Sequence, residues 1–397
     1  MDDVYVKKTY FAMAIDPIHI GTGGYTLGRV ENPILRDFDG IPKIPGTSIE
    51  GTARTYAYFQ GLGTNKACAK GKKTKISEGG KEIEIEPCGR SDCGLCLSFG
   101  FAREDKSSQG MAIFSDAKIL LFPVASLVGP VWITSPGKLK ELGVQQDTSI
   151  WGNFDKSESC IVSNHLKSKL KNVGYLNFGW LLLQLEKKGD QLVTHNICTD
   201  TIFGEDKLSF AQRGLDKKDI FDRLVIVSDS VLPHIVNSNL EVRTSVSISP
   251  ETGAAEEGAL FTYEAIPRGT ILQFTMVYQN PKHFGVTGKN LEDVISTVET
   301  SFELLEFLGV GGMGTRGFGK LKVFGLNKRY DPTKLAQVKV NNMRKRLEEI
   351  EQIMKSAPDE EQAKLEKEKR EILEEMKQAR EKYKQLFETY EKAVEGG

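Results

Sequence analysis

The sequence predicts an α+β protein with a ferredoxin-like sheet, long insertions and a helical C-terminal extension. Strand-like segments at Val4–Ile15 and Lys320–Phe324 enclose the body of the chain. Between them, two amphipathic helical segments, near Thr47 and at Leu291, are each flanked by strand-like segments. This order of elements is typical of a ferredoxin-like fold. From about Lys334 onward glycine and proline nearly disappear, which marks the extension.

The composition is ordinary for a globular chain. Of 397 residues, 39% are hydrophobic and 27% are charged, which suffices for one large core or two smaller ones. No segment approaches the ~20 apolar residues of a membrane span, and the N-terminal apolar run is too short for a signal peptide. We therefore expect a cytoplasmic protein without membrane contact. The net charge of −1 means that nucleic acid can bind only through local basic patches.

Patterning places the main elements of the body, residues 1–330. Thr47 and Glu50 have the spacing of a capping box, which predicts a helix that begins at Thr47. A second helix is predicted over Leu291–Leu308, where apolar residues recur on one face. Apolar and β-branched runs predict the inner strands Ala112–Phe122, Arg223–Val227 and Ile271–Tyr278.

Two further segments stand out along the chain. Glu241–Ile248 and Ala259–Tyr263 bracket a polar turn at Thr252-Gly253, which predicts a β-hairpin. Residues 331–397 carry apolar residues at three- and four-residue spacing, and Pro358 interrupts them, which predicts a helical hairpin. The many charges of this extension form either a solvated face or an assembly contact.

Four of the six cysteines lie close together in a polar insertion, residues 64–98. Cys68, Cys88, Cys93 and Cys96 have the spacing C-x19-C-x4-C-x2-C. A tight turn supplies three of the four thiolates that a closed structural zinc site needs, and metal would stabilise a segment with little apolar content. Unligated thiols are the alternative. Cys160 and Cys198 are predicted to be small buried hydrophobes, and the histidines share no ligand spacing.

A glycine cluster between the second helix and the last strand contains the spacing G-x-G-x-x-G at Gly312, Gly314 and Gly317. A dinucleotide fingerprint follows a strand and opens a helix, and here that order is reversed, which excludes it. The cluster is either a turn alone or a close approach of backbone to an anion. Arg316 within it favours the anion.

The segment from His19 to Arg54 is rich in glycine and proline and ends in the first helix. The amide-rich start of that helix lies near Lys43, Ser48 and Arg54, an arrangement that suits a phosphate group. Glu31 is a carboxylate in the middle of the loop.

Three motifs of the chain can be compared with those of a known family. H-x-G-x-G from His19, G-x-V-E-x-P-I-x-R ending at Arg36, and the proline-rich motif from Gly40 to Arg54 resemble the RAMP backbone subunits of type III CRISPR effector complexes. The segment Phe114–Pro136 is similar to the Cmr (type III-B) branch in particular. The late glycine cluster is a further RAMP feature.

The resemblance implies a modified RRM palm with a β-hairpin thumb, at about residues 236–264. It implies partners as well: a CRISPR RNA, a complementary target RNA, copies of the same chain in a filament, and other type III effector subunits. A filament that does not read sequence needs phosphate and ribose contacts. The residues placed on RNA are His19, Arg36, Lys43, Ser48, Arg54, Gly312, Gly314 and Arg316.

The resemblance also assigns a role to Glu31. In the family the corresponding acid, usually aspartate, is required for cutting target RNA by attack of a 2′-hydroxyl on its own phosphate, with Mg²⁺ or Mn²⁺ assisting. Glutamate keeps the charge but shifts the carboxylate by ~1.5 Å, and a ~1 Å displacement can cost ~100-fold in rate. A guide-binding ribonuclease and a non-catalytic RNA-binding scaffold are therefore both open. A metal-dependent small-molecule enzyme would predict a histidine-rich pocket, which the sequence lacks.

Overall fold

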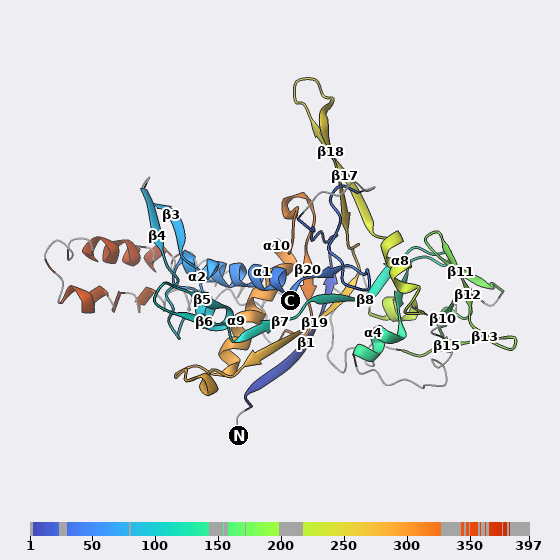
Figure 1. Ribbon diagram of the computed structural model, residues 1–397, viewed down its shortest axis with the longest axis horizontal. Coiled ribbons are helices and arrows are strands. Elements are labelled where there is room, and N and C mark those ends of the chain that lie inside the picture. Colours follow the sequence, from blue (N-terminus) through green and yellow to red (C-terminus); the bar gives the residue numbers. More distant parts are fainter. Residues whose placement is uncertain are drawn as a thin grey trace.

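The computed structural model describes residues 3–23, 30–78, 81–142, 154, 158–170, 172–197, 217–326 and parts of 343–381 (Figure 1). Within them, twelve strands form one mixed sheet. Its main path runs through β11 (Tyr175–Phe178), β12 (Leu181–Leu185), β10 (Ser159–Ser163), β16 (Leu224–Val227), β9 (Val131–Thr134), β8 (Ala117–Val124), β19 (Ile271–Gln279), β1 (Tyr5–Ala14) and β20 (Leu321–Val323). Three short strands pair beside this path: β2 (Lys43–Ile44) with β8, β7 (Ala112–Phe114) with β19, and β15 (Thr194–His195) with β10.

The half of the sheet that contains both predicted outer strands is antiparallel throughout. β1 pairs with β19 on one side and with β20 on the other, and β19 pairs with β8. The helices α1 (Gly46–Phe59) and α9 (Leu291–Glu303) pack against each other, and α9 also packs on β19 and β20. Between helix and sheet the rings of Tyr10, Phe274 and Phe302 contact one another.

The other half of the sheet carries α4 (Pro136–Glu141), α7 (Lys217–Asp222) and α8 (Leu232–Ser238). Its strands include the parallel pairs β9–β16 and β10–β12. A second hydrophobic cluster lies here, around Trp132, Phe221 and Ile226. The body thus buries two apolar cores on one continuous sheet.

Two long hairpins project from the same side of the molecule (Figure 1). One is formed by β17 (Glu241–Ile248) and β18 (Ala255–Ala265), the other by β3 (Thr74–Glu78) and β4 (Lys81–Ile85). Smaller elements in different parts of the molecule complete the fold: α2 (Lys66–Lys70), α3 (Gly94–Phe99), β5 (Gly100–Ala102), β6 (Ser107–Gln109), β13 (Lys187–Lys188), β14 (Gln191–Leu192), α10 (Leu305–Leu308) and the 3₁₀ turns η3 (Pro281–Phe284) and η4 (Gly314–Arg316).

The mixed α+β fold and the hairpin after Glu241 are confirmed, but two boundaries differ from the prediction. The predicted strand over Ala112–Phe122 is interrupted between β7 and β8, and the last predicted helix divides into α9 and α10. The capping box at Thr47 is wrong, because α1 begins at Gly46 and no side chain caps it from its N-cap residue Pro45.

The described residues of the extension are helical in two stretches, within 343–354 and 362–381. Lys369 Nζ of the second lies 2.6 Å from Glu351 Oε1 of the first. The remainder of the predicted helical hairpin, and Cys198, lie outside the described residues. A helix able to cross a bilayer is not found in the part of the chain that the structure describes.

Candidate functional site

Glu31 lies at the outer edge of the β17–β18 hairpin. Asn32 pairs with Tyr263 of β18 in a parallel bridge. The Glu31 carboxylate accepts a hydrogen bond from the Thr262 backbone N–H at 3.2 Å, and the Glu31 N–H donates to Thr262 Oγ1 at 3.0 Å. Glu31 is exposed. The loop therefore presents a carboxylate to solvent in an orientation that β18 fixes.

Arg36 holds the same loop from inside. Its guanidinium donates to Glu264 Oε1 at 2.7 Å, to Asn237 Oδ1 at 2.8 Å and to the Ile34 carbonyl at 2.9 Å. Glu264 in turn accepts from the Ile34 N–H at 3.1 Å. Because three different protein groups bind this guanidinium, we assign Arg36 to positioning the Glu31 loop and not to an RNA phosphate.

His19 joins three segments at the base of the hairpin. Its Nδ1 lies 2.7 Å from the Glu264 carbonyl oxygen and therefore donates to it. Its ring meets that of Tyr263 edge-on at 5.5 Å. Its backbone carbonyl accepts from the Gly312 N–H at 3.0 Å. Only 7% of His19 is exposed, so it contacts the glycine loop and β18 and has little surface left for RNA.

The N-terminus of α1 is occupied by a carboxylate of the protein itself. Asp116 Oδ1 accepts from the Gly46 N–H at 2.8 Å, and Lys43 Nζ lies 2.8 Å from Asp116 and 3.0 Å from Asp37. Burial opposes the ionisation of Asp116, but the hydrogen bonds from Lys43 and Gly46 hold its pKa below its usual range. In this structure a carboxylate of the chain itself thus takes the Gly46 N–H and Lys43 that were predicted to bind a phosphate.

Ser48 and Arg54, the other members of that predicted site, have different surroundings. Ser48 is half-buried in the first turn of α1. Arg54 is 8% exposed and donates to the carbonyls of Cys68 at 2.9 Å, Phe99 at 3.2 Å and Gly100 at 2.5 Å. These three carbonyls, and not a surface open to RNA, surround the guanidinium in this structure. Arg54 instead joins α1 to the cysteine-bearing insertion, and burial lowers its pKa.

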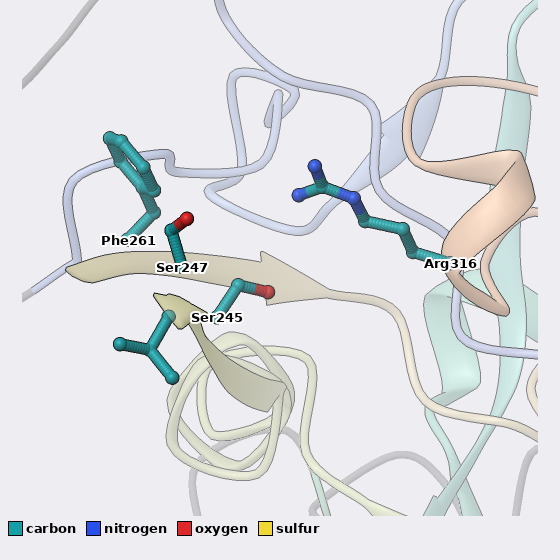
Figure 2. A pocket seen from close by; sticks show the side chains of 5 residues that line it. Ser245, Ser247, Phe261 and Arg316 are labelled. Atoms are coloured by element: carbon teal, nitrogen blue, oxygen red, sulfur yellow. The ribbon is translucent and has the colours of Figure 1, made fainter. Parts of the chain in front are cut away.

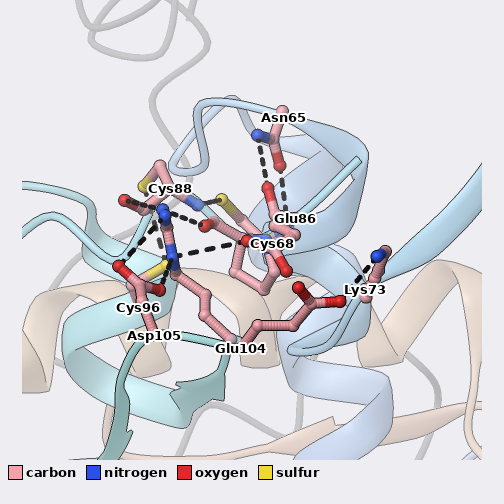
Figure 3. Close-up of polar contacts among 10 residues, drawn as sticks. Asn65, Cys68, Lys73, Glu86, Cys88, Cys96, Glu104 and Asp105 are labelled. Carbon is pink, nitrogen blue, oxygen red and sulfur yellow. Dashed lines mark hydrogen bonds and ion pairs between the residues drawn. The ribbon is translucent and has the colours of Figure 1, made fainter. Parts of the chain in front are cut away.

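The four predicted metal ligands do come together. The sulfur atoms of Cys68, Cys88, Cys93 and Cys96 all lie within 4.8 Å of one another. Cys88 and Cys96 are 3.7 Å apart, close to the sulfur–sulfur separation of a tetrahedral thiolate site (Figure 3). Hydrogen bonds with the neighbouring thiols, Cys88 first, hold the pKa of Cys68 far below its usual range.

These ligands come from three places in the fold. Cys68 lies in α2, Cys88 follows β4, and Cys93 is the N-cap residue of α3. The Cys88 N–H donates to Cys68 Sγ at 3.3 Å, a contact that is common to thiolate sites. Four thiols and no carboxylate make a donor set that fits zinc. The insertion is less core-poor than predicted, because Leu95 and Leu97 join the main core.

The glycine loop, Gly309–Gly319, packs tightly at its ends and is open in its middle. A Cβ on Gly311 would lie 2.5 Å from the His19 carbonyl oxygen, and one on Gly319 would lie 2.6 Å from that of Val310, so both positions require glycine. Gly312 and Gly314 are exposed. Arg316 is exposed too, and its guanidinium has no protein partner among the described residues.

Arg316 faces a groove beside the β17–β18 hairpin (Figure 2). The groove has a volume of about 420 Å³ and is lined by Ser245, Val246, Ser247, Phe261 and Arg316. Ser245 and Phe261 are directly opposite each other in the hairpin register. One cation, two hydroxyl groups and one aromatic ring can bind a phosphate, a ribose and a base face.

Sequence reasoning missed the hairpin side of this groove. Ser245, Ser247 and Phe261 belong to the predicted hairpin, and period-2 alternation could have placed the opposing pair on one face. That this face turns toward Arg316 depends on how the glycine loop packs against His19, which no local pattern encodes.

The chain thus combines a mixed α+β sheet with a projecting β17–β18 hairpin, a glycine loop beside it and a carboxylate that β18 fixes. The chain matches the RAMP superfamily over residues 12–322 and belongs to it. It is 26% identical over 319 residues to the CRISPR system Cmr endoribonuclease Cmr4 of Pyrococcus furiosus, covering 78% of this chain and 92% of that protein.

Solved structures with a similar fold include the two that follow. One is the cryo-EM structure of the Type III-B Cmr-beta complex bound to cognate target RNA, with a TM-score of 0.50, 14% identity, and coverage of 81% of this chain and 98% of the matched chain. The other is oligomeric Cmr4 from Pyrococcus furiosus, with a TM-score of 0.45, 17% identity, and coverage of 81% and 98% respectively.

Proposed function

We propose that this protein is a backbone subunit of a type III-B CRISPR effector complex that holds a guide RNA and cuts the paired target RNA. The observation that carries the proposal is the carboxylate of Glu31, which the backbone N–H of Thr262 fixes at β18, the strand that also carries Phe261 of the groove. The relationship to Cmr4, named as an endoribonuclease, supports the activity. The likeness to Cmr-beta supports the fold.

The palm of such a subunit corresponds to the antiparallel half of the sheet. In chain order its elements are β1, α1, β8, β19, α9 and β20, and their order in the sheet is β20-β1-β19-β8. This is the arrangement expected of a ferredoxin-like, RRM-related palm. The β17–β18 hairpin is then the thumb. CRISPR RNA, target RNA, copies of this chain and other effector subunits are the proposed partners, in the cytoplasm.

The proposed RNA contacts centre on the groove. Arg316 supplies a charge for a phosphate, and the exposed backbone at Gly312 and Gly314 allows close approach. Ser245 and Ser247 supply hydroxyl groups, and Phe261 supplies a ring face for a base. None of these groups distinguishes one base from another. The site therefore suits a subunit that binds any guide sequence.

The proposed reaction is attack by a 2′-hydroxyl of the target RNA on the adjacent phosphorus. A bond from the 2′-oxygen to phosphorus forms, the bond to the 5′-oxygen breaks, and the leaving 5′-oxygen takes a proton. Glu31 can accept the proton of the 2′-hydroxyl or hold a divalent cation at the phosphate. Mg²⁺ or Mn²⁺, when bound, would stabilise the charge on the phosphate oxygens. The exposed oxygen of Glu31 fits either role.

The decisive experiment compares Glu31 with Glu31→Ala and Glu31→Asp on one guide-matched RNA in the assembled complex with Mg²⁺ or Mn²⁺. We expect regularly spaced cuts by the wild type, none by Glu31→Ala, and guide binding by both within about twofold, since a lone carboxylate near phosphates adds nothing to affinity. Equal cutting by Glu31→Ala would place the chemistry elsewhere.

The alternative is a scaffold that binds guide RNA without cutting. The extra methylene of Glu31, relative to the family's usual aspartate, favours it. The same experiment separates the two functions: a wild type that binds but does not cut, with cutting gained in Glu31→Asp, would establish the scaffold.

We also propose that the four cysteines bind one structural zinc ion. Cys68, Cys88, Cys93 and Cys96 would hold it, leaving no position for a substrate. Its contribution is to fix α2, β4 and α3 relative to one another.

A further inference from the structure

The cysteine-bearing insertion carries exposed positive charges that lie outside the groove. We define the cysteine module as residues 64–98, which contain the four thiols, α2 and the β3–β4 hairpin. Lys66 and Lys70 stand four residues apart on α2 and so share one side of that helix, and Lys72 follows directly. All three are exposed, and none has a carboxylate partner among the described residues.

Other lysines of the same module behave differently. Lys73 Nζ lies 3.1 Å from Glu84 and 2.7 Å from Glu104, and Lys75 Nζ lies 3.6 Å from Glu82. These pairs brace the hairpin. The module therefore neutralises part of its positive charge internally and leaves three neighbouring ammonium groups to solvent.

The lysines stand on a well-fixed support. Gly71, between Lys70 and Lys72, has φ of 69°, and a Cβ there would lie 2.5 Å from Arg54 Nη1. Arg54 also binds the Cys68 carbonyl. The lysines lie on both sides of Cys68. Arg54 and the thiol cluster therefore hold the segment that carries them. A positioned ammonium group loses less entropy on binding a phosphate than a mobile one.

We propose that Lys66, Lys70 and Lys72 of the cysteine module form a second contact to the backbone of the bound RNA. This rests on the proposed function. The β3–β4 hairpin, which α2 leads into, projects from the same side of the molecule as the β17–β18 hairpin, with α10 and the glycine loop between them (Figure 1). RNA lying along the groove meets the module on that side. Lysine binds phosphate as a point charge, independent of sequence.

The test is the salt dependence of RNA binding by the full chain. The probe is a labelled guide–target RNA duplex, and fluorescence anisotropy gives the affinity between 50 and 300 mM salt. The variant is Lys66→Gln/Lys70→Gln/Lys72→Gln. Each lost phosphate contact lowers the slope of log K against log salt by about 0.7–0.9. We expect the slope to fall by about 2, and the affinity near 0.15 M salt to fall roughly tenfold.

The matched control is Lys167→Gln/Lys169→Gln/Lys188→Gln, three exposed lysines on the other half of the sheet. It should keep the wild-type slope. Thermal unfolding of both variants is the control for whether each variant is folded. Unchanged slope and affinity in the module variant, with the wild type binding RNA, would overturn the second contact and leave the proposed function standing. A wild type that binds no RNA would overturn the proposed function itself. Loss of a protein subunit from the complex with RNA binding intact would assign the lysines to an acidic protein surface and overturn the proposal.

Discussion

At the scale of single residues, internal partners decide which cations can reach a ligand. Lys43, Arg36 and Arg54 all lie close to the predicted RNA path, yet each is bound by carboxylates or carbonyls of the protein. Arg316 is exposed and faces the groove. A nearly neutral chain can therefore bind a polyanion at a small number of positions.

Asp116 provides the first prediction. Replacing it with alanine removes the acceptor of the Gly46 N–H and one of the two partners of Lys43. We expect the free energy of unfolding, from denaturant titration, to fall by about 1–3 kcal/mol. Asp116→Asn keeps an acceptor and should lose less. Asp105→Ala removes an exposed ion pair with Arg103 and should leave the free energy of unfolding almost unchanged. Equal losses at both sites would contradict this account.

His195 makes stability depend on pH. Burial lowers its pKa to about 4, and its Nε2 donates to the Leu224 carbonyl at 3.0 Å. The unfolded chain takes up a proton near pH 6.5 and the folded chain only near pH 4, so stability is complete above pH 6.5 and is lost as pH falls toward 4. At pH 5 we expect a loss of about 2 kcal/mol relative to pH 7.

The measurement is urea unfolding at pH 7 and pH 5. His195→Gln should remove most of the difference, whereas His234→Gln, at an exposed position, should keep it. A pH response shared equally by both variants would assign it to other groups.

At the scale of elements, local patterns located strands and helices but not their junctions. Alternation predicts β1, and apolar spacing predicts α9, because each follows from one face packing on the core. The start of α1 was misplaced since Asp116, seventy positions along the chain, accepts the hydrogen bond from Gly46. Likewise, the sequence did not reveal that Arg54 binds backbone carbonyls, because those carbonyls belong to segments further along the chain. Contacts between residues so far apart in the chain leave no pattern in the local sequence.

The cysteine module yields the third prediction. Purified protein should contain close to one zinc per chain, and a strong chelator should lower its unfolding temperature. Cys96→Ser should lower zinc content, whereas Cys160→Ala, in the other half of the sheet, should not. Zinc below about half an equivalent per chain would contradict the site.

At the scale of the whole molecule, the residues that carry the proposed function all lie in the body. Glu31 and Arg316 are nearly three hundred positions apart, yet both lie beside the β17–β18 hairpin: Thr262 of β18 binds Glu31, and Arg316 lines the groove with Ser245 and Phe261. The family match ends at residue 322, before the extension. The sequence motifs indicated this division, while the sheet order that creates the groove became visible only in the fold.

Truncation before Asp331 tests that division. We expect the shortened chain to bind guide RNA within a few-fold of the full chain, because the groove lies outside the extension. The measurement is the affinity for a labelled guide RNA, with far-ultraviolet circular dichroism to show that the body is folded. A collapse of affinity in a folded body would make the extension an RNA clamp.

The bond between Glu31 and β18 has a consequence for substitutions at position 262. Its donor is the backbone N–H of Thr262, which every amino acid except proline possesses. A change of side chain at position 262 would therefore keep this bond to the carboxylate, although the Glu31 N–H would lose its acceptor, Thr262 Oγ1. Of the substitutions at this position, Thr262→Pro alone removes the backbone donor and so releases the carboxylate.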